Sequence, residues 1–411
     1  LHKAIRRQRQ MCIRDSMKIV ITHLDFSAYF VDRLLAFQEF CKCRKDELYI
    51  IEVLGESPLY PFLSVSKSKL YNFEYLFPDN NYDNISVKSI NKKLQKRLTE
   101  INPDVIFSGP LAFPSSAAAL KWAKKNNRGI VLFDDCHKDT FVRGKLNTFI
   151  KKYLYTCVDA FFCPSPDYED SMRYWGFEKE QIFYGLNAVN NSFWWSECGK
   201  YLDNNDEAYF VTVGRQVPFK NLVFFLKSYL VYLHKGGKTP LIMVGNGPEH
   251  NVLKKMAANN PNIIFKDFMK PAELKQLYRK TKALIVPSHK TETWGLVVNE
   301  ALCAGRVVAV SNEVGCVNTL VRSHQNGFVF DPNSTESIVS SLCLIDSLSN
   351  KELSDYGKMG QNIVNDWGLQ RFCQGLYSAL SFSKDHHRKT SIFSSILCRC
   401  WNGQLHKMQR V

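Results

Sequence analysis

Two carboxylates in one short stretch have the spacing to hold both ends of a single ligand. The stretch 287–305 reads PSHKTETWGLVVNEALCAG and carries Glu292 and, eight positions later, Glu300. It follows the apolar run Ala283–Val286, which predicts a buried parallel strand, and Leu296–Cys303 has helical spacing. A helix start offers backbone N–H groups and a positive dipole end to an anion. We therefore expect a ligand with phosphate in its middle and hydroxyls at both ends, held by charge-assisted hydrogen bonds.

Two basic residues follow the strand predicted at Tyr209–Val213. These are Arg215 and Lys220, in the stretch GRQVPFKN. Arginine presents a planar fork to phosphate oxygens, and lysine supplies a compact charge. Together they could neutralise the charge that develops on a diphosphate leaving group. The cations and the acids, taken separately, are also compatible with solvated surface charges, so the interpretation depends on their convergence.

Glycines follow two of the strands predicted in this half of the chain. Gly214 comes after the first of these strands, and Gly245 and Gly247 come after Leu241–Val244. Glycine allows a close approach of the backbone to a ligand. Any tight strand-to-helix turn can use the same residues, so this G-x-G pattern is weak by itself.

Polar residues also follow strands predicted nearer the N-terminus. His23, Asp25 and Tyr29 come after Lys18–Thr22, and His137 ends the cluster DDCH beyond another predicted strand. Loops at the carboxyl ends of parallel strands face the ligand crevice. We expect these residues to contact a second substrate, with His137 as a base, metal ligand or hydroxyl binder. A merely structural loop is the alternative.

Strands and helices alternate over two long stretches, which predicts an α/β protein with two tandem Rossmann-like, doubly wound domains and a cleft between them. Two such units of similar size would let one ligand touch both. The predicted strands are Lys18–Thr22, Leu48–Val53, Val105–Ser108, Ile130–Phe133 and Ala160–Cys163, then Tyr209–Val213, Leu241–Val244, Ile263–Lys266, Ala283–Val286, Val307–Val310 and Phe328–Phe330. The predicted helices include Phe30–Cys41, Asn91–Thr99, Ser115–Lys125, Lys145–Thr156 and Trp367–Leu380.

The predicted organisation has five parts. Residues 1–16 lack the apolar centre of a signal peptide and resemble a translated adapter, so we expect Met17 to be the native start. An N-terminal domain at 17–200 and a C-terminal domain at 201–365 follow, and then a helix within 366–382. The basic tail, 383–411, is predicted to be disordered, with a membrane-surface segment as the alternative.

Composition restricts the setting in which the protein works. The formal net charge is +15, but the basic residues form no stripe typical of nucleic-acid binding. Basic clusters at 88–97 and 145–152 are either solvated helix faces or contacts for anionic lipid or a pyrophosphate-linked acceptor. No apolar run reaches the roughly 18 residues that span a bilayer. The 13 cysteines lack zinc-site spacing, which favours a reducing, cytoplasmic compartment.

Taken together, these stretches resemble the family-4 retaining glycosyltransferases, which have two Rossmann-like domains in the GT-B arrangement. The resemblance covers nearly all of residues 17–380, and the stretches that carry it are VGRQVPFKN, VGNGP, ETWGLVVNEALCAG, GCVNTLV and NGFVFDP. It implies a nucleotide-sugar donor in the C-terminal domain and a glycan or lipid-linked acceptor in the N-terminal one. It also implies retention of the anomeric configuration, no metal, and a C-terminal helix that crosses back to the first domain.

The resemblance assigns roles to individual residues. Arg215 and Lys220 would hold the diphosphate, Glu292 would meet the sugar hydroxyls, and Glu300 would meet the ribose. The family usually has F-x-G before the loop that binds the nucleobase, and this chain has Phe265-Lys266-Asp267 instead. Phe268 is the candidate contact to the base. The backbone of Thr293, Trp294, Gly295 and Leu296 would complete the phosphate site. A role in surface polysaccharide assembly at the inner face of the cytoplasmic membrane is expected from the family alone.

Three other functions remain open on the sequence. Glu292 and Glu300 could be the paired carboxylates of a glycoside hydrolase, although such a site has no need of Arg215 and Lys220. A nucleotide-sugar epimerase of the same architecture would act without an acceptor. A non-catalytic sugar-binding or scaffold subunit of a polysaccharide-assembly complex would have no need to keep all four side chains.

Overall fold

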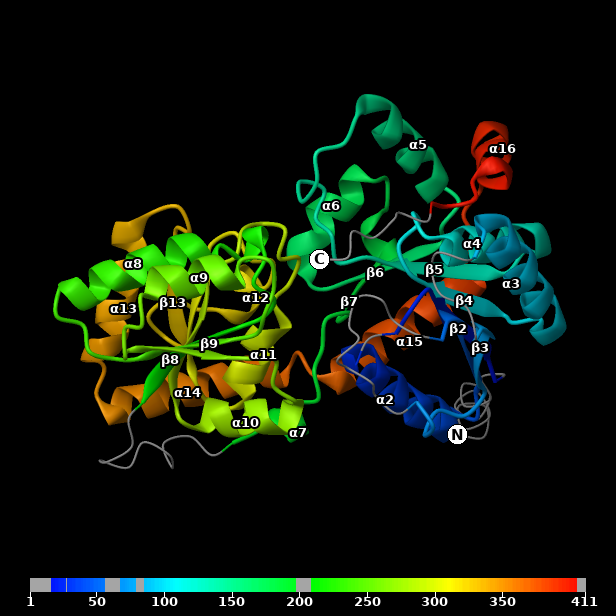
Figure 1. The fold of residues 1–411 in the computed structure, drawn as a ribbon. Helices are drawn as coiled ribbons and strands as arrows, with labels where there is room; N and C mark the ends of the chain where they lie inside the picture. The colour runs from blue at the N-terminus through cyan, green and yellow to red at the C-terminus, as the bar shows by residue number, and fades with distance from the viewer. Residues whose placement is uncertain (1–15, 27, 56–66, 79–84, 197–207, 405–411) are drawn as a thin grey trace.

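The chain folds into two α/β domains that lie side by side, each built on one parallel sheet (Figure 1). The computed structural model describes residues 16–26, 28–55, 67–78, 85–196 and 208–404. Both predicted sheets are therefore present. The boundary predicted at residue 200 and most of the predicted leader, residues 1–15, lie outside the described residues.

The first domain has a seven-stranded sheet in the order β3-β2-β1-β4-β5-β6-β7, in which every pair is parallel. Strand β1 lies between β2 and β4, so the chain order reverses there, and the crevice of such a sheet lies outside its carboxyl ends. The strands are β1 (Lys18–His23), β2 (Glu47–Leu54), β3 (Phe73–Phe77), β4 (Val105–Ser108), β5 (Gly129–Phe133), β6 (Ala160–Cys163) and β7 (Ile182–Tyr184).

Helices cover both faces of this sheet because its strands are apolar on both faces. On one face, Ile21 of β1 is buried in the same cluster as Phe37 of α2 and Leu376 of α15 (Leu369–Asp385). On the other face, the neighbouring Val20 is buried with Leu94 of α3. The helices of this domain are α2 (Ala28–Arg44), α3 (Val87–Ile101), α4 (Pro114–Asn126), α5 (Lys145–Tyr155) and α6 (Glu169–Tyr174), with 3-10 turns η2 (Pro166–Tyr168) and η3 (Lys179–Gln181). The short helix α7 (Asn191–Trp194), which follows in the chain, packs against α11 (Leu296–Cys303) of the second domain.

The second domain has a six-stranded parallel sheet in the order β10-β9-β8-β11-β12-β13. Strands β8 and β11 are neighbours, so the loops that follow them meet at one edge. The strands are β8 (Tyr209–Val213), β9 (Leu241–Val244), β10 (Ile263–Lys266), β11 (Thr281–Val286), β12 (Val307–Ser311) and β13 (Gly327–Phe330). The helices are η4 (Pro218–Lys220), α8 (Leu222–His234), α9 (His250–Ala257), α10 (Pro271–Arg279), α11 (Leu296–Cys303), α12 (Val317–Leu320), α13 (Thr335–Ser347) and α14 (Asn350–Asn365).

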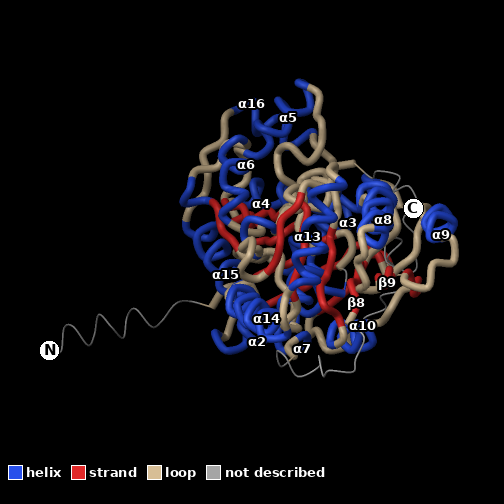
Figure 2. The backbone as a smooth tube through the Cα atoms, turned by 90° about the vertical axis from the view of Figure 1, so that its left-hand side faces the viewer, coloured by secondary structure: helices blue, strands red, loops and turns tan. Residues whose placement is uncertain are grey.

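The chain returns to the first domain after α14, as predicted. Helix α15 (Leu369–Asp385) packs against α2 and against strands of the first sheet. Helices α2, α7, α14 and α15 gather on one side of the molecule (Figure 1, Figure 2). An apolar core continues across the domain boundary, where the rings of Tyr168 and Trp294 lie 6.5 Å apart and those of Trp294 and Trp367 lie 6.2 Å apart.

The prediction of a disordered tail was wrong for residues 383–404. The first of these residues extend α15, and Ile392–Cys400 forms another helix, α16, which packs against α5 and α4. Ser391 caps this helix by accepting a hydrogen bond from the backbone of Ser394 at 3.0 Å. The buried face of this helix consists of Ser394 and Cys398, so the sequence showed no apolar stripe that would have predicted a packed helix. Within the described residues, no helix is long and apolar enough to cross a bilayer.

Candidate functional site

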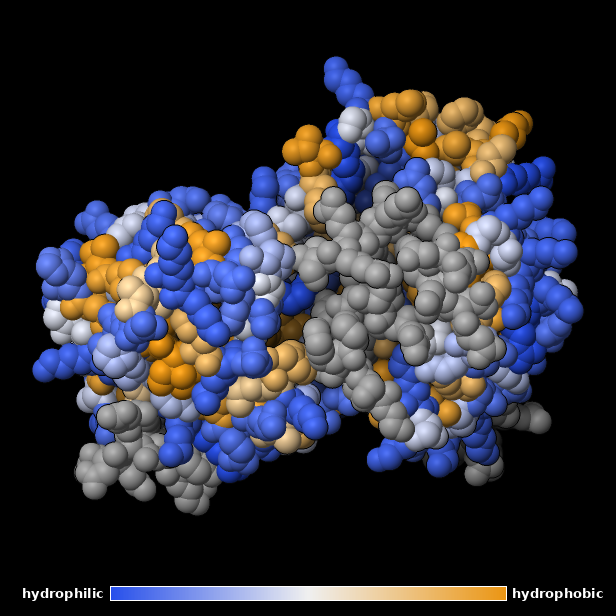
Figure 3. All heavy atoms as spheres, viewed as in Figure 1, coloured by the Kyte–Doolittle hydropathy of each residue, from blue (hydrophilic) through white to orange (hydrophobic). Residues whose placement is uncertain are grey.

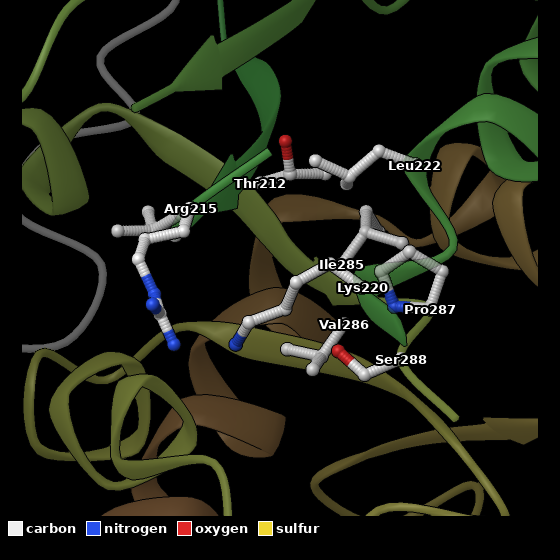
Figure 4. A pocket seen from close by; sticks show the side chains of 10 residues that line it. Thr212, Arg215, Lys220, Leu222, Ile285, Val286, Pro287 and Ser288 are labelled. Carbon is white, nitrogen blue, oxygen red and sulfur yellow. The ribbon is translucent and has the colours of Figure 1, made fainter. Parts of the chain in front are cut away.

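A pocket opens at the carboxyl ends of β8 and β11, where Arg215 and Lys220 both lie on its wall (Figure 4). Their charged ends extend to the same side of the pocket (Figure 4). The predicted convergence of the two cations is therefore present. The other lining residues are Thr212, Val213, Gly214, Leu222, Ile285, Val286, Pro287 and Ser288.

One of the predicted acids meets one of the cations. Lys220 Nζ donates to Glu292 Oε2, and the two side chains form an ion pair that is largely shielded, with 16% and 15% of the side chains exposed. Ser288 Oγ, on the pocket wall, also donates to Glu292 Oε2 at 3.3 Å. A carboxylate and an ammonium group thus lie together beside a pocket that also holds a guanidinium group.

The loop that carries Glu292 is held by backbone hydrogen bonds to two other segments of the second domain. His289 N donates to the carbonyl of Phe219 at 2.8 Å, which ties the loop to the turn before Lys220. Gly315 N donates to the carbonyl of Glu292 at 3.1 Å. Because Glu292 lies between these anchors, its carboxylate is pre-positioned, as electrostatic stabilisation requires.

The turn that carries Lys220 is fixed by Asn221. This residue adopts a left-handed conformation with φ 55°, which a single asparagine tolerates. Its Nδ2 donates to the carbonyl of Pro332 at 2.9 Å. Pro332, the last residue of the NGFVFDP stretch, therefore helps to fix the turn that carries Lys220.

Glu300 lies in a different environment from the one expected of a ribose contact. Its side chain is fully buried, and its carboxylate accepts hydrogen bonds from Tyr29 of the first domain and, at 3.0 Å, from Tyr278 of α10. Burial raises the pKa of Glu300 to about 7, against the opposing effect of the two hydrogen bonds. In this structure the tyrosine hydroxyls, rather than solvent, face this carboxylate.

Tyr29 donates a hydrogen bond to Glu300, and its predicted contact with the acceptor stays a prediction. Helix α2 begins at Ala28, so Tyr29 lies in its first turn at the boundary with the second domain. The hydrogen bond therefore joins residues 271 positions apart and connects the two domains.

The side chain of Trp294 does not line the pocket. It is 1% exposed, and its Nε1 donates to Asn299 Oδ1 at 2.9 Å. Gly295 follows with φ +89° and leads into α11 at Leu296, a start without a side-chain cap. Only the backbone of this segment is therefore available for the predicted phosphate contact.

Gly245 and Gly247 have a structural use, which is the alternative that the sequence left open for this G-x-G pattern. A Cβ at Gly245 would collide with the carbonyl of Gly214, and one at Gly247 would lie 2.6 Å from the carbonyl of Gln216. Gln216 N also donates to the carbonyl of Asn246 at 2.9 Å. These glycines let the loops after β8 and β9 pack together, which shapes the wall that carries Arg215.

Phe268 follows the edge strand β10 and is 45% exposed. In the sheet order two strands, β9 and β8, lie between β10 and β11. The exposed ring is accessible to a ligand, and its contact with a nucleobase stays a prediction.

The first domain reaches the Glu292 loop through Thr293. Tyr168 donates its hydroxyl hydrogen to the carbonyl of Thr293, and Thr293 Oγ1 donates to Asp135 Oδ2 at 3.0 Å. The His137 ring lies edge-on to Tyr168, with 6.1 Å between ring centroids. His137 is thus two contacts away from the loop that carries Glu292, on the opposite side of the boundary.

Asp135 is part of the cluster that follows β5. Burial, and then the neighbouring carboxylate of Asp134, raise the pKa of Asp135, while hydrogen bonds from Thr293 and Asn187 oppose the rise. Asp134, Asp135 and Cys136 place potential ligand atoms within 4.8 Å of one another. Thr293 and Asn187 already donate hydrogen bonds to the Asp135 carboxylate. The bond from Thr293, in the second domain, accounts for the position of this carboxylate at the domain boundary.

His23 and Asp25 lie at the end of β1, but His23 is enclosed by rings. Its ring lies 5.2 to 6.2 Å from those of Phe26, Phe30, Phe113 and Phe133. Burial lowers the pKa of His23 to about 4, in spite of the nearby Asp25. His23 is therefore neutral near pH 7, and its acceptor role remains a prediction.

We expect Thr293→Val to destabilise the protein by about 1.5 to 3 kcal/mol, because it removes a hydrogen bond to a charged group. The isosteric valine leaves Asp135 without its 3.0 Å donor at the domain boundary. Urea unfolding of the ligand-free protein measures the change. Thr293→Ser keeps the hydroxyl and should restore most of the loss; equal losses in both variants would assign the effect to packing.

Sequence reasoning missed Tyr168, Tyr278 and Ser288 at this site. Tyr168 and Tyr278 are buried side chains in ordinary apolar patterns, and nothing in their spacing identifies them as donors to distant groups. Ser288 stands directly beyond β11, at the end where crevice residues are expected, so its position was a usable signal.

Residues 196–363 match the family model described as glycosyl transferases group 1. An uncharacterised glycosyltransferase of Methanocaldococcus jannaschii is 26% identical over 165 residues, 39% of this chain and 40% of the relative. The D-inositol 3-phosphate glycosyltransferase of Acidothermus cellulolyticus is 33% identical over 132 residues, 29% of each chain. The matched segment spans less than half of the length of these curated relatives.

Solved structures match over much more of the chain. A glycosyltransferase from Rickettsia africae superposes with a TM-score of 0.70 at 16% identity, covering 90% of this chain and all of that one. HepE of Anabaena, solved with UDP, superposes with a TM-score of 0.66 at 14% identity, covering 89% of this chain and all of that one. These similarities show that the chain has the two-domain GT-B fold. The match over residues 196–363 supports the group 1 glycosyltransferase family.

Proposed function

We propose that the protein is a retaining glycosyltransferase that moves a sugar from a nucleotide-diphosphate sugar to a glycan or lipid-linked acceptor. The observation that carries the proposal is the ion pair of Lys220 with Glu292 beside a pocket that Arg215 shares. The family match to the same segment supports it. UDP and UDP-glucose are bound by HepE, a structural neighbour, which supports a nucleotide-sugar donor.

The proposed chemistry begins when the donor's diphosphate enters between Arg215 and Lys220. Lys220 then exchanges its bond to Glu292 for phosphate oxygens, and the freed carboxylate accepts hydrogen bonds from sugar hydroxyls. As the glycosidic bond breaks, negative charge grows on the leaving phosphate, and the two fixed cations stabilise it. Charge neutralisation by these side chains is the reason to propose that transfer needs no metal ion.

The first domain supplies the other wall of the proposed reaction site. His137 lies across the boundary from the Glu292 loop, in ring contact with Tyr168, which binds that loop. An acceptor hydroxyl held on this side would attack the anomeric carbon on the face from which the phosphate leaves, and would give its proton to the departing phosphate oxygen. The anomeric configuration is retained if the attack of the hydroxyl and the departure of the phosphate occur on the same face of the sugar. We propose a cytoplasmic setting in surface polysaccharide assembly, as the family resemblance suggests.

A panel of nucleotide sugars tests the donor site. A donor present near 100 times its dissociation constant should stabilise the protein by about 2.7 kcal/mol, which a thermal shift detects. Release of nucleotide diphosphate in the presence of candidate acceptors then reports transfer, and the anomeric NMR coupling of the product reports retention. Binding without release indicates the scaffold alternative, and turnover of the donor alone to an isomeric sugar indicates the epimerase.

A further inference from the structure

Exposed apolar side chains concentrate on two neighbouring helices of the first domain and on the loop before them. We call this the α5–α16 surface. Figure 3 shows it as an apolar area at the outer end of the first domain, over α5 and α16. Its exposed members are Phe141 (49%), Val142 (103%), Leu146 (71%), Phe149 (48%), Ile392 (83%), Phe393 (49%) and Ile396 (55%).

The two helices form one continuous surface although they are about 240 positions apart in the chain. The ring of Phe393 lies 6.1 Å from that of Phe149 and 5.0 Å from that of Tyr153. Beneath these rings, Thr156 Oγ1 donates to Ser394 Oγ at 2.9 Å. The apolar side chains of the two helices therefore form one patch. A contiguous exposed apolar patch indicates a contact surface, whereas scattered single apolar residues do not.

The exposure of α16 is a consequence of how the helix is anchored. Ser394 is 1% exposed and Cys398 is 4% exposed, so the inner face of the helix is packed against the domain. Just beyond the helix, Trp401 Nε1 donates to the carbonyl of Leu111 at 2.9 Å. With this face fixed inward, Ile392 and Ile396 point outward, and the structure contains nothing that covers them among the described residues.

The charges around the surface are mostly positive. Residues 138–153 contain five basic side chains against one acidic, and residues 384–400 contain four against one. Some of these cations are engaged inside the domain, but Lys145, Lys389 and Arg399 are exposed. Exposed apolar side chains flanked by exposed cations are the combination that inserts at the boundary between lipid headgroups and acyl chains.

We propose that the α5–α16 surface docks the protein on a bilayer that contains anionic lipid. The apolar side chains would enter the interface while Lys145, Lys389 and Arg399 meet the negative headgroups. A second copy of the chain fits less well, because two such surfaces would bring like charges together. Lys145 belongs to the basic cluster at 145–152, for which contact with anionic lipid was one of the alternatives. The proposal gives Lys145 that role.

The proposal deepens the proposed function and rests on it in one respect, the choice of acceptor. Helix α5 follows the loop that carries His137, and both belong to the domain expected to hold the acceptor. Docking through α5 would bring that side of the cleft close to the membrane. We therefore infer that the acceptor is lipid-linked rather than a free glycan.

Vesicle co-sedimentation of the full chain tests the docking without requiring any activity. The protein should bind vesicles of phosphatidylcholine mixed with phosphatidylglycerol, and should bind vesicles of phosphatidylcholine alone at least about tenfold less. Added salt should weaken the binding, because headgroup attraction is screened. A protein that ignores the mixed vesicles, or binds both kinds equally, overturns the proposal.

Two sets of substitutions locate the binding face. The variant Leu146→Ser/Ile392→Ser/Ile396→Ser and the variant Lys145→Glu/Lys389→Glu/Arg399→Glu should each bind mixed vesicles at least about tenfold less. The replaced side chains are exposed, so both variants should keep the melting curve of the parent protein. Matched controls in the second domain, Val252→Ser/Ile264→Ser and Lys254→Glu/Lys255→Glu, also replace exposed residues and should bind normally.

The outcomes separate this proposal from the function on which it builds. Normal vesicle binding by both α5–α16 variants overturns the proposed surface. Loss of self-association in these variants, with no vesicle binding by the parent, would assign the surface to a second copy instead. Release of nucleotide diphosphate to a soluble acceptor analogue should be unchanged in both variants, since neither touches the Lys220 pocket. Failure of that release in every protein would count against the proposed function alone.

Discussion

Lys220→Ala is expected to lower kcat at least about 100-fold, the scale of losing one contact that acts on charge developing in the transition state. Lys220 Nζ is the cation that pairs with Glu292, and it lies on the wall of the pocket shared with Arg215. Without it, the leaving diphosphate would lose one of two compensating charges. Steady-state kinetics with the donor found in the panel measure the change in kcat and KM separately.

The matched control is Lys238→Ala, which removes an exposed lysine of the same domain. Its kcat should equal that of the parent protein. The loss in Lys220→Ala should fall on kcat rather than on the KM for the acceptor, because the acceptor is proposed to bind the other domain. A kcat within threefold of the parent value would remove Lys220 from the proposed mechanism.

A double-mutant comparison tests whether Lys220 and Glu292 act together. Lys220→Ala leaves a largely shielded carboxylate without its partner, which adds a stability cost unrelated to transfer. Combining it with Glu292→Gln removes the charge, so unfolding experiments should show the double variant more stable than Lys220→Ala. Activity losses that are far from additive indicate one functional unit, and full additivity would contradict a shared role.

Glu300→Gln is expected to remove a large part of the pH dependence of stability below pH 7. The folded-state pKa of Glu300 is raised from 4.5 to about 7, so the folded protein retains a proton that the unfolded chain loses. The stabilisation that comes from this retained proton is therefore fully present below pH 4.5, and it is lost as the pH rises to about 7. The decrease in the free energy of unfolding amounts to at most about 3 kcal/mol, from 1.4 kcal/mol per pKa unit.

Urea unfolding of the ligand-free protein between pH 4.5 and 8 measures this effect. The curve of Glu300→Gln should be flatter, and at pH 8 this variant should be more stable than the parent protein. Burial raises the pKa of Glu52 to about 8, against the nearby Lys67, but Glu52 is present in both proteins and cancels in the difference. Parallel curves for the two proteins would show that folding does not raise the pKa of Glu300.

Tyr29→Phe provides an independent check on the same carboxyl. The hydrogen bond from Tyr29 favours the charged form of Glu300, so its loss should raise the pKa of Glu300 further. The decline in stability should then extend to higher pH than in the parent protein. Because Tyr29 belongs to the first domain and Glu300 to the second, the shift would also report that the two domains are in contact in solution.

Much of the fold could be predicted because its signals are local. Strands β4, β6, β8, β9 and β10 match the predicted ranges, since each is a short, mostly apolar run that polar, glycine or proline residues end. Strands β3 and β7 were not predicted: both lie at sheet edges, and β3 has a single fully buried residue, Leu76. An edge strand needs less apolar sequence, so its pattern is weaker.

The sequence by itself determined which residues stand at the carboxyl ends of the strands. That is why Arg215, Lys220 and Glu292 could be grouped: β8 and β11 are neighbours in a doubly wound sheet, and their loops meet. Only the tertiary structure decided the environment of Glu300, whose partner Tyr29 is 271 positions away. It likewise decided the packing of α16, because α5 covers one face of that helix and leaves the other exposed. Burial and pairing between distant segments depend on which surfaces meet in space, and local spacing carries no information about that.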